Sequence, residues 1–222
     1  MRLPNSKKPD FSRAYSKANE ILVKSSAIQT FPFSPKDLVK EQTPIVCRSF
    51  KKARKYGVDI TAFGSESAII MSFQGKKIIF YDETKPDTHN RFSILHELGH
   101  EINSHDFSKK DEDTYRRYEV ETNYFAAQLL MPEQILRECQ NRGARINRFF
   151  LQINFGVSAQ AADKRIETLA RTNVEWRSRA EKEFDDIILI KYADFLNRIC
   201  PIRNTYDFED EYIRQQERNS WF

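Results

Sequence analysis

The sequence predicts an α+β protein that is mainly helical and contains one small β-hairpin. Most of the chain places apolar residues at the three- and four-residue spacing of amphipathic helices. The exception is residues 67–82, where two short runs rich in β-branched and aromatic residues flank a Gln-Gly pair. With 222 residues, of which 40% are hydrophobic, the chain is long enough to bury one core.

The N-terminal stretch is predicted to form helices with an excess of basic residues. One helix begins after Asp10, whose side chain can accept hydrogen bonds from the free N–H groups of a first turn. Ser34 followed by Pro35 is typical of a second helix start. A further basic helix is expected to end just before Gly57. These patterns define residues 1–57 as a basic helical N-terminal extension.

The rest of the chain divides into a core and a tail. Residues 58–180 hold the hairpin and the helices that carry the chemistry described below, and residues 181–222 form a helical C-terminal tail. The basic N-terminal part could meet nucleic acid, but no tight cluster of Lys and Arg accompanies it, so a solvated surface is favoured. The first residues lack the apolar core that a signal peptide needs, and no run reaches the roughly 18 apolar residues of a membrane span. Three widely spaced cysteines favour a reduced, cytoplasmic protein without a membrane partner.

The helix predicted over residues 92–103 contains the motif HELGH. At 100° per residue, His96 and His100 lie on one face and the apolar residues lie on the other. Two imidazoles one turn apart can reach the same tetrahedral metal ion. Glu97 lies at the edge of the histidine face, where a general base for water activated by a metal belongs. Gly99 costs about 1 kcal/mol in a helix interior, so we expect a neighbouring backbone to pack closely there.

A third metal ligand can be sought in two places. An extended zinc-protease pattern, HExxHxxGxxH, would place Asn103 and Asp106 at its last two positions, with Asn103 in a left-handed turn. The alternative is the next helix, in which Glu119 and Asn123 share a face with apolar residues. A carboxylate on a core face is costly unless it is paired or binds a metal. Glu119 is therefore the favoured ligand, and Asn123 can fix the tautomer of a ligand histidine.

The sequence also suggests roles for other residues near the two motifs. Glu121 falls on the opposite face of the second helix, which is expected to face solvent, so its replacement should leave the metal in place. His105 could donate a hydrogen bond in the transition state or cap the first helix, and capping is favoured. Tyr118, Tyr115 and Arg91 are all close enough in sequence to help hold an oxyanion, and the sequence does not choose among them.

The segment "RFSILHELGHEINSH", followed by "EVETNYFAAQLLMP", resembles the ImmA/IrrE family of zinc metallopeptidases. Members of that family pair an HExxH helix with a downstream helix of the pattern ExxANxFAAxLLMP. The resemblance extends over roughly residues 58–172, and Thr122 stands where the family usually has Ala. The two motifs together are specific, because each is long and they occur in the order of the family.

The resemblance implies a zincin-like metallopeptidase core. It implies that Zn²⁺ is bound by His96, His100 and Glu119 and that Glu97 is the general base. Members of the family typically cleave or otherwise inactivate helix-turn-helix repressors of mobile elements, phages or stress regulons. A repressor of this kind is therefore the expected substrate.

Two other functions remain open at this point. Residues 145–171 predict a helix, a turn at Gly156 and a helix capped by Ser158. Gln160, Lys164 and Arg165 are then placed to touch DNA. A DNA-binding regulator is thus one alternative, although a plain helical hairpin packed on the core is favoured. The other alternative is an antirepressor that does not cleave its partner and uses zinc only for structure.

Overall fold

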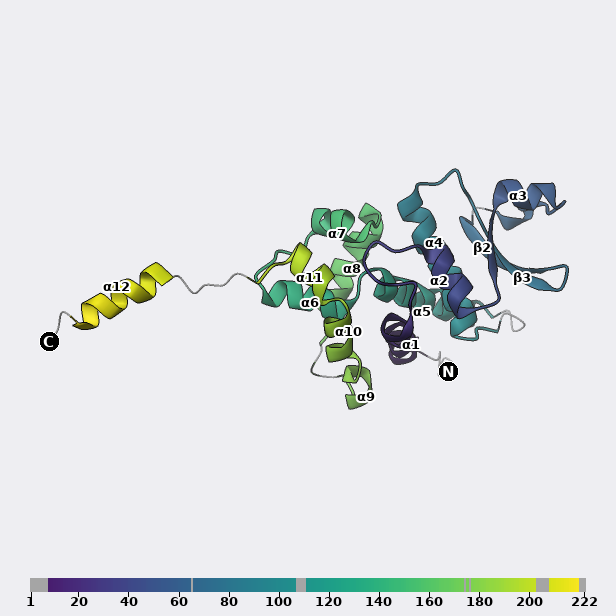
Figure 1. Ribbon diagram of the computed structural model, residues 1–222. Helices are drawn as coiled ribbons and strands as arrows, with labels where there is room; N and C mark the ends of the chain where they lie inside the picture. Colours follow the sequence, from purple (N-terminus) through teal and green to yellow (C-terminus); the bar gives the residue numbers. More distant parts are fainter. Residues whose placement is uncertain are drawn as a thin grey trace, which may run out of the picture.

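The computed structural model describes residues 8–64, 66–106, 111–173, 175, 177–202 and 208–219. It confirms the predicted α+β class, with many helices and one small sheet (Figure 1). In chain order the elements are α1 (Phe11–Lys24), α2 (Pro35–Gln42), β1 (Val46–Ser49), α3 (Phe50–Lys55), the 3-10 helix η1 (Ile60–Phe63), β2 (Ala68–Phe73), β3 (Lys76–Tyr81), α4 (Asp87–Ile102), α5 (Glu112–Leu130), α6 (Glu133–Asn141), α7 (Arg148–Phe155), α8 (Ala159–Arg171), α9 (Arg179–Lys182), α10 (Asp185–Lys191), α11 (Ala193–Ile199) and α12 (Phe208–Asn219).

The helix starts and stops predicted in the N-terminal stretch are confirmed. The side chain of Asp10 accepts a hydrogen bond from the N–H of Arg13 at 2.9 Å, and Ser34 caps α2 with Pro35 in its first turn. Helix α3 stops just before Gly57, whose φ of 75° suits a residue without a Cβ. The strand β1, which lies between α2 and α3, was not predicted.

The sheet has the strand order β1-β3-β2. Strands β2 and β3 form the predicted antiparallel hairpin, in which Ile70 lies opposite Ile79. Gln74 and Gly75 connect them with φ values of 49° and 76°, and positive φ at both positions matches the twist of a two-residue hairpin turn. Strand β1 pairs in parallel with β3, so β2 is left at the edge of the sheet.

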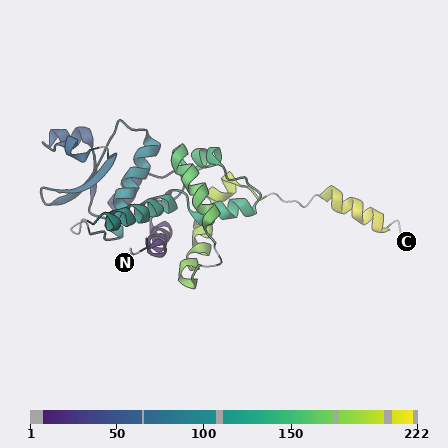
Figure 2. The ribbon, with the colours of Figure 1, turned by 180° about the vertical axis from the view of Figure 1, so that it is seen from behind.

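Helix α5 contacts α4 along one side and α1 along another (Figures 1 and 2). This arrangement corrects the expectation that one face of α5 points to solvent. On that face Gln128 is fully buried and Glu121 is 6% exposed. The ring of Tyr124 packs edge-on against Phe11 of α1 at 5.2 Å between centroids. The periodicity of a single helix cannot show that a distant helix covers its polar side.

Gly99 lies where α4 crosses α5. A Cβ at this position would lie 2.9 Å from Cδ1 of Phe125 and 3.3 Å from Cγ2 of Thr122. The close neighbours are therefore side chains of α5, and not a backbone as the sequence led us to expect. The two helices that carry the candidate site approach closely because this position has no side chain.

We expect Gly99→Ala to lower the free energy of unfolding by about 1 kcal/mol. Alanine favours a helix by about 1 kcal/mol over glycine. Overpacking a rigid core costs about 1–3 kcal/mol, and Phe125 is fully buried, so its ring has little room to move. Urea denaturation of both proteins measures the difference. A higher unfolding midpoint for the variant would show that the contact yields easily.

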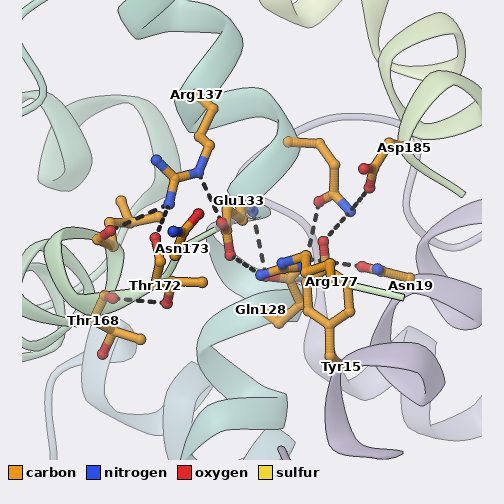
Figure 3. A network of polar contacts seen from close by, with 12 residues as sticks. Tyr15, Asn19, Gln128, Glu133, Arg137, Thr168, Thr172, Asn173, Arg177 and Asp185 are labelled. Carbon is orange, nitrogen blue, oxygen red and sulfur yellow. Dashed lines mark hydrogen bonds and ion pairs between the residues drawn. The ribbon is translucent and has the colours of Figure 1, made fainter. Parts of the chain in front are cut away.

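A buried polar network fastens α1 to the helices around it (Figure 3). The amide of Gln128 in α5 donates to Oδ1 of Asn19 in α1 at 2.8 Å and to Oε1 of Gln134 at 3.0 Å. The amide of Gln134 in turn donates to the hydroxyl of Tyr15 at 2.8 Å and to Asp185 at 2.9 Å. Buried amides must be paired in this way to offset their desolvation. The network fixes the position of α1 on α5.

The helical pair α7 and α8 forms with the predicted boundaries, but one DNA-facing assignment is wrong. Gly156 ends α7 in the left-handed conformation, and Ser158 caps α8. Arg165 is only 1% exposed, and its Nε donates to the carbonyl of Met131 at 3.0 Å. It is therefore held inside the protein and cannot touch DNA. Lys164 remains at the surface in an ion pair with Glu167.

Helices α10 and α11, within the stretch assigned to the tail, contribute to the core. Ile188 is fully buried, and Phe195 and Leu196 are buried beside it. The hydroxyl of Tyr192 donates to the carbonyl of Leu22 in α1 at 2.8 Å. Helix α12 is drawn apart from these helices in Figure 1. Among the described residues, no helix is long and apolar enough to cross a membrane.

Candidate metal centre

Helices α4 and α5 bring His96, His100 and Glu119 together. The Nε2 atoms of the two histidines lie 3.1 Å apart. Oε2 of Glu119 lies 3.2 Å from Nε2 of His96, and Oε1 lies 3.3 Å from Nε2 of His100. The three residues that the sequence singled out as ligands thus converge on one point. The i, i+4 spacing on α4 and the close crossing of α5 produce this arrangement.

Asn123 lies where the sequence placed it, behind His96. Its Oδ1 is 3.1 Å from Nδ1 of His96. A carbonyl oxygen can only accept, so Nδ1 of His96 carries the proton and Nε2 presents its lone pair to the site. This is the tautomer that a metal ligand needs. The side chains of Glu119 and Asn123 line an accessible rim and do not enter the apolar core.

Glu97 is buried beside the ligands and turned toward the sheet. It is 8% exposed, and its Oε2 accepts a hydrogen bond from the N–H of Ile70 in β2 at 2.9 Å. Burial raises the pKa of Glu97 to about 7, although His96 and the Ile70 N–H act to lower it. A carboxylate with a pKa near neutrality can both accept and return a proton.

Glu119 has the opposite electrostatic character. Burial acts to raise its pKa, but the imidazoles of His100 and His96 beside the carboxylate outweigh burial and hold the pKa of Glu119 well below its usual range. Tyr115, one turn earlier on α5 and half exposed, interacts with the same carboxylate. Glu119 is thus a permanent anion at the site, and Glu97 is a carboxylate that can change its protonation state.

The donor set fits a bound cation. With the Nε2 lone pairs of His96 and His100 facing the carboxylate of Glu119, two nitrogens and two carboxylate oxygens face one another at 3.1 to 3.3 Å. Such groups repel one another unless a positive charge lies among them. His96, Glu97 and His100 also form a cluster whose ligand atoms lie within 4.8 Å of one another. Because Oε2 of Glu97 is held by the N–H of Ile70 in β2, Glu119 is the candidate for the third ligand position.

The other residues that the sequence offered as candidates lie outside the donor set. Asn103 ends α4 with φ of −81° and donates to the carbonyl of Gly99, so it does not form the left-handed turn considered from the sequence. Ser104 adopts that conformation, with φ of 53°. Asp106 is exposed. The ring of His105 is nearly buried and lies behind His100.

Glu121 and His105 form a pair that the sequence did not predict. Oε2 of Glu121 lies 3.0 Å from Nε2 of His105, and the rings of His105 and Tyr118 stack with centroids 4.0 Å apart. Glu121 had been assigned to the surface, and that assignment is wrong. It is buried because α1 covers this side of α5. The sequence does contain both partners close to the two motifs: His105 follows HELGH by five residues, and Glu121 follows Glu119 by two. This proximity could have indicated the pair.

A groove of about 190 Å³ opens beside the ligands. One wall is the edge strand β2, with Ile70, Met71 and Ser72, and the other wall includes His100 and residues near the end of α4. An ion pair between Lys77 and Glu101, 2.6 Å long, bridges the sheet and α4. The groove thus lies between the edge strand and the candidate ligand His100.

Residues 51–167 match the model of the IrrE N-terminal-like domain, Peptidase_M78. The chain belongs to this family. The match covers more than half of the chain and includes α4 and α5 with every residue of the donor set. Membership of Peptidase_M78 points to a metallopeptidase and agrees with the resemblance described from the sequence. No curated protein and no solved structure gave a significant match.

Proposed function

We propose that the protein is a zinc-dependent endopeptidase that cleaves a helix-turn-helix transcriptional repressor. The triangle formed by His96, His100 and Glu119 supports this proposal most directly. Zinc binds nitrogen and oxygen at about 2.0–2.1 Å, so tetrahedral ligands lie roughly 3.3–3.4 Å apart. The distances here, 3.1 to 3.3 Å, are close to that value before any adjustment. Three protein ligands leave a fourth position open for chemistry.

The side chains around the donor set suit peptide hydrolysis. Bound zinc supplies Lewis-acid activation of water and of the scissile carbonyl. Glu97 accepts a proton from the attacking water and passes it to the leaving amine. In the metal-free protein burial raises its pKa to about 7, so this carboxyl group can hold or release a proton near neutral pH. The N–H of Ile70 holds the carboxylate in place through its bond to Oε2.

The groove favours an extended peptide. Strand β2 lies at the edge of the sheet and forms part of the groove lining through Ile70, Met71 and Ser72. An extended segment can add to such an edge through backbone hydrogen bonds. The cleaved part of a repressor would then be a linker or loop, because a folded helix has no free backbone groups to offer.

The test combines metal content with cleavage. The purified protein is expected to contain about one zinc ion per chain by elemental analysis. Incubation with a helix-turn-helix repressor encoded beside its gene should give discrete fragments by mass spectrometry. Removing zinc with a chelator should stop cleavage, and adding zinc back should restore it. An unrelated folded protein serves as the control substrate. Zinc-independent inactivation of an intact repressor would favour a non-cleaving antirepressor and contradict the proposal.

A further inference from the structure

A chain of side chains leads from α1 to the metal ligand His100. The backbone N–H of Asp10 donates to Oε1 of Glu121 at 2.8 Å. Oε2 of Glu121 lies 3.0 Å from Nε2 of His105, and Nδ1 of His105 lies 3.0 Å from Nδ1 of His100. Each pair shares one hydrogen, so the position of a single proton determines the others.

The backbone is shaped to place His105 in this chain. Ser104 has φ of 53°, which non-glycine residues seldom adopt, and outliers of this kind cluster at functional sites. This turn brings the N–H of His105 to the carbonyl of His100 at 3.0 Å and folds the imidazole back behind the ligand. The ring of Tyr118 then stacks on it, with the two planes 6° apart.

With one proton on the ring of His105, two directions of hydrogen bonding are possible. In the first, Glu121 accepts from Nε2–H of His105, whose bare Nδ1 accepts from Nδ1–H of His100. Nε2 of His100 then presents a lone pair to the metal. In the second, Glu121 is protonated and donates, every bond reverses, and Nε2 of His100 carries a proton that excludes the metal.

The surroundings of Glu121 select the first direction. Oε1 already accepts the N–H of Asp10, and Nε of Arg117 lies 3.8 Å from the same atom. Both groups beside this carboxyl group are donors, so the geometry places Glu121 as the acceptor and His105 as the donor of their shared hydrogen bond. Because His105 then has its proton on Nε2, its Nδ1 accepts a hydrogen bond from Nδ1–H of His100, and Nε2 of His100 keeps a lone pair for the metal.

We infer that Glu121 and His105 are positioning residues that fix the tautomer of His100 for metal binding. The inference rests on the proposed zinc site, in which Asn123 does the same for His96 through one direct bond. The two ligands are therefore oriented by different means. His96 relies on α5 alone, whereas His100 depends on a two-residue relay that ends at the first residues of α1.

The ring tautomers test the relay without reference to activity. The full chain has only four histidines, so a nitrogen–proton correlation spectrum of labelled rings is simple to assign, with His89→Gln removing the histidine outside the site. Both the metal-free and the zinc-loaded protein should show His105 with its proton on Nε2 and His100 with its proton on Nδ1. A proton on Nδ1 of His105 in either state would overturn the inference.

Zinc affinity provides the second test, measured by competition with a chelator. His105→Leu is expected to weaken zinc binding about 10- to 100-fold, as for other residues that orient metal ligands. His105→Gln should recover most of this loss, because a carboxamide keeps one acceptor and one donor. His89→Gln is the matched control and should bind zinc like the wild type.

The outcomes separate this inference from the proposed function. A wild-type protein that binds no zinc contradicts the proposed function, and the ring tautomers still decide the relay. If His105→Leu folds and binds zinc as tightly as the wild type, the relay has no role in orienting His100. If His105→Gln binds no better than His105→Leu, packing and not hydrogen bonding explains the effect, and the inference fails. If His105→Leu does not fold, the tautomers alone decide.

Discussion

Glu97→Gln is expected to abolish peptide cleavage and to leave the metal bound. Glutamine keeps the shape of the side chain and can still accept the hydrogen bond from Ile70 through its carbonyl oxygen. It cannot take a proton from water, and general-base catalysis contributes about 10²- to 10⁴-fold to rates. Because Glu97 is not one of the three proposed donors and its Oε2 accepts from the N–H of Ile70, zinc content should be unchanged by elemental analysis.

The control for this experiment is a carboxylate on the same pair of helices but outside the site. Glu112 at the start of α5 is exposed and paired with Arg116, so Glu112→Gln should cleave like the wild type. Fragment yield by mass spectrometry, at equal enzyme concentration, compares the variants. The Glu97→Gln protein should still bind the repressor, since recognition comes from the groove. If it still produced fragments at the normal rate, Glu97 would not be the base.

Glu119→Ala is expected to reduce zinc affinity by roughly 100- to 1,000-fold. Structural zinc sites gain about 10–16 kcal/mol in total, so one of four ligands contributes on the order of 3–4 kcal/mol. Glu119 also supplies the negative charge that balances the cation, and its pKa lies well below the usual range. Competition with a chelator measures the loss, and cleavage should disappear with the metal.

Glu121→Ala provides the comparison on the same helix. Its effect on zinc affinity should be smaller, about tenfold, because it acts on His100 only through His105. The sequence alone led us to expect no effect. A larger loss of zinc affinity from Glu121→Ala than from Glu119→Ala would show that Glu121, and not Glu119, is the third ligand.

The parts of the site that follow local periodicity could be predicted from the sequence. His96 and His100 share a helix face because 3.6 residues per turn leave no other choice. Glu119 was chosen because it shares a face with apolar residues, and the structure brings its carboxylate to both histidines. Gly99 marked a close contact, although the neighbour proved to be the ring of Phe125.

The parts that depend on distant segments could not be predicted. Strand β1 is four residues long and is stabilised by β3, about thirty residues away, so no local pattern identifies it. The side of α5 that holds Glu121 is polar in sequence, yet α1 buries it. Arg165 has the periodicity of an exposed recognition helix, but its guanidinium satisfies a carbonyl at the end of α5. The periodicity within one helix cannot show these partners, because they come from distant parts of the chain.

The anchoring of α1 by the C-terminal helices also sets an order of events during synthesis. The side chains of Lys191 and Tyr192 donate hydrogen bonds to the carbonyl of Leu22. At roughly 5–20 residues per second, Leu22 leaves the ribosome on the order of 10–30 s before Lys191 and Tyr192. His96, His100 and Glu119 emerge within that interval. The nascent chain therefore exposes its metal ligands to the surroundings before its first helix has been locked into place.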